Sequence, residues 1–388
     1  MRKPYHDVVA AVPVTIPYVR YSTRSAHWWI ARALEALLQE SGFSKDTIDG
    51  FCVSSFTLAP DTAVGLAQQL GVSPRWLDHI PMGGACGLVA LRRAARAVQA
   101  GDADVVACIA GDTNHIDTFR LNLGSFSQFA RDATYPYGAG GPNATFALLT
   151  SYYMREYGFS REDFGKLCLA FRENALKFSG ALMTRPLTMD EYLGSRVICE
   201  PLGLYDCVMP CAGADAFLVL GRERAEDAGI PYARILGTIE RTNAFPEDPI
   251  QARGGWARDC AELYAMSGLG PDDMDFVQLY DDYPVVVVQQ LEDCGFCPKG
   301  ECRDFVRQHT FEAGGSFPIN TSGGQLSVGQ AGAAGGYLGL VEAIRQLSGR
   351  PHGAAVDDAA AGFVSGFGMV SYDRGLCTSA AILASGSA

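Results

Sequence analysis

The sequence lacks any apolar run close to the ~18 residues that a membrane-spanning helix requires. It also lacks the pattern of a secretory leader, because residues 1–7 lead directly into the short apolar run VVAAV. Neither a P-loop nor a strand-bound GxGxxG occurs, which disfavours nucleotide hydrolysis and dinucleotide-dependent chemistry. From these absences we expect a cytoplasmic protein without a membrane segment.

Positive charge is also scarce. The 388 residues include 31 Lys and Arg against 43 Asp and Glu, which gives a formal net charge of −12. A chain this acidic has no general affinity for a phosphate backbone, so we expect no nucleic-acid role. The 44 glycines and 19 prolines are spread along the chain, which excludes a low-complexity or disordered protein.

Cysteine, by contrast, is abundant, with 12 in the chain. In a reducing compartment most of them are expected to pack as small apolar residues. Cys294, Cys297 and Cys302 have the spacing C-x2-C-x4-C, and His309 could supply a fourth zinc ligand. Because the helical pattern places Cys294 on a packed face, we predict no metal site.

Short apolar runs alternate with helix-type segments along the whole chain, which predicts an α/β protein with a sheet covered on both faces. The first run, residues 8–12, is expected to end at Pro13, which lacks a ladder donor. The pattern occurs twice, which predicts a duplication with halves at 1–235 and 236–388. Residues 112–215 are predicted to be an insertion whose loops line a binding pocket.

A glycine-rich turn runs directly into an alanine-rich helix over residues 80–98, with Cys86 in the first turn. The positive end of a helix dipole favours a thiolate there, and the turn glycines would let a substrate approach. Cys86 is therefore a candidate nucleophile. The alternative is that Cys86 only packs in the core.

Taken with the strand that ends at Gly111, this turn and helix resemble the thiolase superfamily, and more narrowly the sterol-carrier-protein type. The resemblance implies a duplicated five-layer α-β-α-β-α fold, a homodimeric core and an acyl-CoA substrate, with coenzyme A as substrate or product and no bound cofactor. The other stretches that carry it lie at 101–106, 188–207, 280–283, 291–301 and 320–347.

Three departures from the family pattern affect the chemistry. The position of the classical nucleophilic cysteine corresponds to Gly84, two residues before Cys86. The family's Gly-His-Pro is Gly-Gln-Ala here, with Gln330 in place of histidine. The histidine of the sterol-carrier-type His-Asp-Cys-Phe motif is replaced by Tyr280.

Our first hypothesis is thiolase-type acyl transfer to coenzyme A, with Cys86 as the nucleophile and Tyr280 as the acid and base. Gln330 and the loop Gly366, Phe367 and Gly368 would donate hydrogen bonds to the thioester oxyanion. Two further residues, His115 after a strand end and Tyr283 in the Tyr280 motif, are expected to bind substrate.

Two alternatives remain open. A retro-aldol lyase acting on a β-hydroxyacyl-CoA would use Tyr280 and leave Cys86 without a chemical role, as the resemblance to steroid side-chain aldol lyases implies. Those lyases are expected to carry a second tyrosine where this chain has Gln330. The chain could also be a non-catalytic acyl-CoA-binding subunit. The resemblance further implies a small zinc-ribbon/OB-fold protein as partner in a heteromeric complex.

Overall fold

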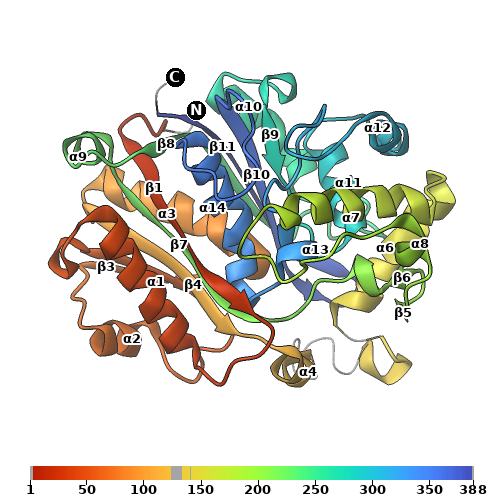
Figure 1. The fold of residues 1–388 in the computed structure, drawn as a ribbon, viewed down its shortest axis with the longest axis horizontal. Helices are drawn as coiled ribbons and strands as arrows, with labels where there is room; N and C mark the ends of the chain where they lie inside the picture. Colours follow the sequence, from red (N-terminus) through yellow and green to blue (C-terminus); the bar gives the residue numbers. More distant parts are fainter. Residues whose placement is uncertain (1–2, 124–132, 140, 387–388) are drawn as a thin grey trace.

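The computed structural model describes residues 3–123, 133–139 and 141–386, and its mixed α/β architecture confirms the predicted fold class (Figure 1). The strands of the large sheet are β1 (Val8–Val19), β2 (Gly50–Ser54), β3 (Trp76–His79), β4 (Val105–Thr113), β7 (Ala212–Gly221), β8 (Tyr232–Thr242), β9 (Phe276–Gln278), β10 (Ala361–Ser371) and β11 (Arg374–Ser385), and a small sheet pairs β5 (Val197–Cys199) with β6 (Leu202–Gly203). The helices are α1 (Ala26–Ser41), α2 (Ala63–Leu70), α3 (Cys86–Ala100), α4 (Ile116–Leu123), α6 (Pro142–Glu156), α7 (Arg161–Leu176), α8 (Met189–Leu193), α9 (Arg222–Asp227), α10 (Trp256–Ser267), α11 (Pro284–Asp293), α12 (Cys302–Gln308), α13 (Gly324–Val328) and α14 (Gly335–Leu347).

The large sheet has the strand order β3-β2-β4-β7-β1-β8-β11-β10-β9. Read outward from the junction of β1 and β8, both sides give two antiparallel pairings followed by a parallel one. The first side ends in β3, whereas the second side ends in a single bridge between Val277 and Ile319. The second set of strands starts at Tyr232, so the sequence-based boundary at 235/236 falls inside β8.

Helices α3 and α14 lie between the two sets of strands, as Figure 1 shows, and each contacts strands of both sets. Helix α1 covers the outer face of the first set, and α10 covers the outer face of the second. Alternate side chains of β7 serve the two sides: Phe217 and Val219 face the central helices, while Leu218 and Leu220 face α1. This gives the five-layer succession of helix, sheet, helix, sheet and helix.

The segment between β4 and β7 covers most of the insertion predicted at 112–215, whose bounds fall inside these two strands. Its helices α6 and α7 pack against α11 of the second half, and together they form one apolar cluster. The inserted segment therefore packs against the second half of the fold, next to the edge of its set of strands. No helix in the described part of the chain is both long and apolar enough to cross a membrane.

The expected end of the first strand at Pro13 was wrong. Strand β1 continues to Val19 because the pairing with β7 shifts register between Ala11 and Val14. Val12 in this bulge has a φ of +53°. A bulge is one of the few places where a sheet accepts a proline, since the ladder bond is already interrupted there.

Glycines allow the two central helices to approach each other closely. A Cβ on Gly87 of α3 would overlap the carbonyl oxygen of Gly336 in α14. A Cβ on Gly336 would in turn lie 2.9 Å from the backbone of Gly84. The turn before α3 is thus held at the distance that bare glycine backbones permit.

We predict that Gly87→Ala lowers the free energy of unfolding by about 1–3 kcal/mol, because a methyl group must force the two helices apart. Gly65→Ala in α2 is the matched control, since its Cβ would meet nothing closer than 3.8 Å. That control should be neutral or stabilising by about 0.5–1 kcal/mol. Denaturant unfolding of both variants measures the difference, and equal stabilities would contradict the close approach.

Candidate active site

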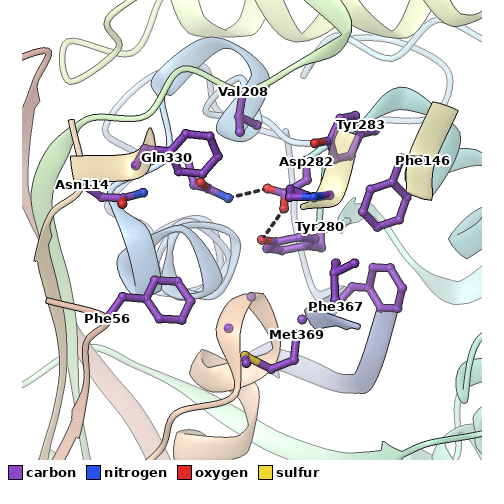
Figure 2. Close-up of a pocket in the computed structure, with 16 residues that line it drawn as sticks. Phe56, Asn114, Phe146, Val208, Tyr280, Asp282, Tyr283, Gln330, Phe367 and Met369 are labelled. Carbon is purple, nitrogen blue, oxygen red and sulfur yellow. Dashed lines mark hydrogen bonds between the residues drawn. The ribbon is translucent and has the colours of Figure 1, made fainter. Parts of the chain in front are cut away.

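A cavity of about 230 Å³ lies where segments far apart in the sequence meet (Figure 2). They are the turn before α3, the segment after β9, the turn before α14, strand β10 and the insertion. Its apolar wall includes Phe56, Phe119, Phe146, Val208, Phe367 and Met369, and its polar side chains are Asn114, Tyr280, Asp282, Tyr283 and Gln330. No lysine, arginine or histidine is among the described residues that line it.

Three polar side chains form a hydrogen-bonded chain at the cavity wall, marked by the dashed lines in Figure 2. Tyr280 donates its hydroxyl proton to Oδ2 of Asp282 at 2.9 Å. Gln330 donates from Nε2 to Oδ1 of the same carboxylate at 2.7 Å. Two residues on which the sequence analysis centred are thus joined through one that it did not single out.

The environment changes the proton affinities of this chain. Burial raises the pKa of Asp282 to about 7; the neighbouring Asp281 raises it too, while the hydrogen bonds from Tyr280 and Gln330 lower it. Burial, together with the Asp282 charge, raises the pKa of the Tyr280 phenol well above its ordinary value of ~10. Tyr280 therefore holds its proton at neutral pH, and Asp282 is near its midpoint.

The backbone around Tyr280 is fixed by buried side chains. Asp281 points away from the cavity and accepts the backbone N–H groups of Gln325 at 2.8 Å and Leu326 at 3.2 Å. Gln290 accepts the backbone N–H of Tyr280 at 3.2 Å and donates to its carbonyl at 2.7 Å. The two adjacent carboxyls therefore have different functions, since Asp281 anchors α13 and Asp282 faces the cavity.

Asp112, at the end of β4, joins two loops that frame the site. It accepts the hydroxyl of Ser55 at 2.6 Å and the backbone N–H groups of Phe56 and Thr57 at 2.9 and 2.7 Å. It also accepts the backbone N–H of Ala333 at 2.7 Å. This buried carboxylate fixes the loop that carries Phe56 relative to the turn that follows Gln330.

The Tyr280 ring occupies the space beside Gly84. A Cβ built on Gly84 would overlap the ring and the carbonyl oxygen of Phe367. By the family resemblance, Gly84 is the expected counterpart of the classical nucleophilic cysteine. A side chain at that position and the present Tyr280 rotamer therefore exclude each other, and a phenol stands where a thiol would project.

Cys86 lies two residues further on, inside the central helical layer. Its side chain is 0% exposed, its Sγ contacts the carbonyl oxygen of Ala333 at 3.2 Å, and it is not among the residues lining the cavity. Burial raises the pKa of the thiol, so the favourable end of the helix dipole does not produce a thiolate. The structure gives Cys86 the packing environment of the alternative considered from the sequence.

The other predicted site residues divide into two groups. Phe367, Gly368 and Tyr283 line the cavity, and Tyr283 stacks on Phe146 at 4.6 Å between ring centroids. Gly366 instead packs beneath the turn, where a Cβ would lie 2.7 Å from the carbonyl oxygen of Gly84. His115 lies outside the cavity, with its ring 4.8 Å from that of Tyr21.

The cysteines of the C-x2-C-x4-C stretch are buried. Burial raises the pKa values of the Cys294 and Cys302 thiols. In the described ranges no three histidine, cysteine, aspartate or glutamate side chains are grouped so that they could hold a metal ion.

Comparison with known proteins identifies the family. The Thiolase C-terminal domain-like family matches residues 243–379. The steroid side-chain-cleaving aldolase of Thermomonospora curvata is 33% identical over 351 residues, which cover 86% of this chain and 88% of that protein. This chain belongs to the thiolase superfamily.

Other similar proteins place this thiolase-superfamily chain in the sterol-carrier-protein-like group that its motifs indicated. The 17-hydroxy-3-oxo-4-pregnene-20-carboxyl-CoA lyase of Mycobacterium tuberculosis is 30% identical over 86% of the chain and 89% of that protein. The solved structure of the Ltp2-ChsH2(DUF35) aldolase superposes with a TM-score of 0.82 at 29% identity, covering 98% of each chain. The relatives include lyases as well as thiolases.

Sequence reasoning missed Asp282, Asn114 and Phe146, which also line the cavity of this superfamily member. Asp282 was visible as the second carboxyl of the Tyr-Asp-Asp-Tyr motif. Asp282 lies two positions after Tyr280, and this spacing was the available signal. In a segment that leaves a strand end, side chains two positions apart can point to the same side. Asn114 directly follows β4, where α/β proteins place ligand groups, but the sequence analysis named the next residue, His115, as the candidate.

Introducing the missing cysteine should not produce a thiolase. We predict that Gly84→Cys lowers the free energy of unfolding by about 1–3 kcal/mol, because the new side chain must displace Tyr280. In a Tyr280→Ala background the same substitution should cost less, although the Phe367 carbonyl still crowds it. A double-mutant cycle measured by denaturant unfolding gives this coupling. An equal cost in both backgrounds would show that the ring does not exclude a side chain at position 84.

Proposed function

We propose that this enzyme cleaves the carbon–carbon bond of a β-hydroxyacyl-CoA by a retro-aldol reaction. The observation that carries the proposal is the overlap between the Tyr280 ring and any side chain at Gly84. A Claisen mechanism needs a sulfur nucleophile that reaches the thioester. A retro-aldol cleavage needs none, and a phenol at that place suits the proton transfers it requires.

In the proposed reaction the β-hydroxyl proton leaves, and the electrons of its O–H bond form a new carbonyl. The Cα–Cβ bond breaks, and its electron pair becomes the enolate of the thioester. Protonation of Cα then gives an acyl-CoA beside a ketone or aldehyde. Tyr280 conducts the proton transfers, and the relatives named as an aldolase and an acyl-CoA lyase support this reaction class.

The thioester oxygen needs hydrogen-bond donors while it carries the enolate charge. Gln330 uses one Nε2 hydrogen for Asp282 and has a second one to donate. The backbone of Phe367 and Gly368 lines the same cavity and remains the second proposed source of donors. Cys86 has no chemical role in this proposal.

The cavity wall indicates the class of acyl group. Phenylalanine, valine and methionine supply seven of the sixteen described lining residues, and none of that lining is cationic. Asp282 adds negative charge when it ionises. We therefore propose a neutral, apolar group next to the cleaved bond, with the relatives' steroid substrates as one example of that chemistry.

Two substitutions separate the proposed reactions. With a neutral β-hydroxyacyl-CoA, Tyr280→Phe should lower kcat by about 10²–10⁴-fold, because the phenolic proton path is lost. Cys86→Ala should leave kcat within about twofold of the wild-type value. Mass spectrometry of the wild type with substrate should show no acyl group on Cys86. Product analysis by liquid chromatography measures both.

The opposite pattern, with an acyl group trapped on Cys86 and activity lost in Cys86→Ala, would support thiolase-type transfer instead. Binding of the CoA thioester without turnover, even with a partner protein present, would support the non-catalytic subunit.

We also propose a homodimeric core that binds a small DUF35-type protein of the zinc-ribbon/OB-fold kind. The similar solved structure contains such a partner, since its name includes ChsH2(DUF35). Strand β3 is the outermost strand of the large sheet, and Trp76 and Leu77 are only partly buried on it. An edge strand with free backbone groups is suited to pairing with a second copy.

Light scattering should therefore give twice the mass of one chain. Co-expression with a DUF35 protein encoded beside this gene should yield a stable heteromer on size-exclusion chromatography. A mass of one chain would contradict the proposed dimer, and separate elution of the DUF35 protein would contradict the proposed heteromer. A proline in place of Leu77 tests the edge, and it should shift the dimer towards monomer because proline removes a backbone donor.

A further inference from the structure

The proposed retro-aldol reaction, on which this inference rests, leaves one chemical problem unsolved. Tyr280 must accept a proton from the substrate, but burial and the Asp282 charge raise its pKa far above neutrality. A phenol with that proton affinity does not supply phenolate at pH 7. The site therefore requires a second group that takes the proton onward.

Asp282 differs from the other buried carboxyls of the described chain in facing the cavity; Asp215 has similar partners, the hydroxyls of Thr15 and Tyr18, but does not line it. Asp281 accepts two backbone N–H groups, Asp293 pairs with Lys299 at 3.1 Å, and Asp206 pairs with Arg161 at 2.9 Å. Asp282 accepts one hydrogen bond at each oxygen, from Tyr280 and from Gln330. In the described ranges it has no ion pair, and it is partly accessible from the cavity.

The direction of the Tyr280 bond matters for the relay. The phenolic proton points to Oδ2 of Asp282, so Oη is the donor in that bond and can accept another proton through a lone pair, although the Gln330 amide also acts on Oη. Figure 2 shows the Tyr280 hydroxyl and the Gln330 amide each joined by a dashed line to the Asp282 carboxylate. A proton that reaches Oη can therefore be exchanged for the one that Oη passes to Asp282.

We propose that Asp282 is the terminal proton acceptor of the reaction, that Tyr280 relays the proton, and that Gln330 is a positioning residue for the carboxylate. As the β-hydroxyl proton moves to Oη of Tyr280, the phenolic proton moves to Oδ2 of Asp282. The substrate's O–H electrons form the carbonyl, and the Cα–Cβ pair becomes the enolate. The reverse relay delivers the proton to Cα and restores both side chains.

This relay supplies a second group for the retro-aldol hypothesis, which lacked the second tyrosine expected at Gln330. Gln330 cannot carry a proton, but its amide holds Oδ1 at 2.7 Å and keeps Oδ2 aimed at the phenol. No cofactor or oxidant is needed, because the same proton leaves the hydroxyl and arrives at Cα. The carboxylate acts through the phenol, and Tyr280 remains neutral before and after each turnover.

The groups that face Asp282 are all neutral or acidic. They are Tyr280 and Asp281 in its own segment, Gln330 from the turn before α14, and Cys207 and Tyr283, whose pKa values its charge helps to raise. Because burial disfavours the charge, the pKa of Asp282 is about 7 in the folded protein against ~4 in an unfolded chain. Its favourable contribution to stability is complete below about pH 4 and is lost as the pH rises through about 7.

The test compares Asp282→Asn with the wild type on a neutral β-hydroxyacyl-CoA between pH 5.5 and 8.5. Wild-type kcat should rise with pH around a midpoint near 7, because only the carboxylate accepts a proton. Asp282→Asn should lose about 10²–10⁴-fold in kcat and lose this rise. Gln330→Met should keep the rise but move its midpoint upward, because the hydrogen bond that lowers the pKa is gone.

A second measurement needs no substrate. The thermal midpoint of Asp282→Asn minus that of the wild type should increase from pH 5.5 to pH 8.5. The wild type is destabilised as Asp282 ionises in a buried site, whereas the variant carries no charge there. A difference in thermal midpoint that does not change with pH would show that Asp282 does not titrate in this range. Either that result, or an Asp282→Asn enzyme with the wild-type pH profile, would overturn the relay.

The relay and the proposed function fail in different ways. An active wild type, an inactive Tyr280→Phe and a fully active Asp282→Asn would overturn the relay alone. A wild type that cleaves no β-hydroxyacyl-CoA, with or without a partner protein, would overturn the retro-aldol proposal and the relay with it.

Discussion

The contact between the Tyr280 ring and the bare backbone of Gly84 is the constraint from which the site follows. Because the ring lies where a side chain would project, the cavity presents a hydroxyl at this place. The turn that presents Gly84 can come this close only because Gly87 and Gly336 let the central helices touch. Packing in the middle layer of the fold therefore determines which functional group reaches the cavity.

The two carboxyls after β9 show how one fold can separate anchoring from chemistry. Both oxygens of Asp281 accept backbone N–H groups at the start of α13, which holds its side chain away from the cavity. Asp282, one residue later, points to the opposite side and shares its oxygens with a phenol and an amide. Burial raises the pKa of both carboxyls to about 7, but only Asp282 lines the cavity.

The α/β class, the repeated strand pattern and the family could be read from the sequence, because apolar periodicity and long motifs carry them. Tyr280, Gln330 and Phe367 were found in the same way and do line the cavity. Cys86 misled because the helix-dipole argument is local, whereas its burial comes from Ala333 in a distant turn. Asp282 was not predicted because the Tyr-Asp-Asp-Tyr motif does not show which of its two carboxyls hydrogen-bonds to backbone N–H groups and which to a phenol.

The cavity is assembled from three parts of the chain, and the first half of the fold contributes Phe56 and the turn with Gly83 and Gly84. The reacting chain of hydroxyl, carboxyl and amide belongs to the second half of the fold, whereas Phe146 and Val208 of the wall come from the inserted segment. Where the first half closes its sheet with β3, the second has only the Val277–Ile319 bridge, and the insertion packs nearby on α11. The hydrogen-bonded polar side chains and part of the apolar wall therefore come from separate stretches of the sequence. Under the proposed function, substitutions in the segment between β4 and β7 would change which acyl group fits and leave the Tyr280–Asp282–Gln330 chain intact.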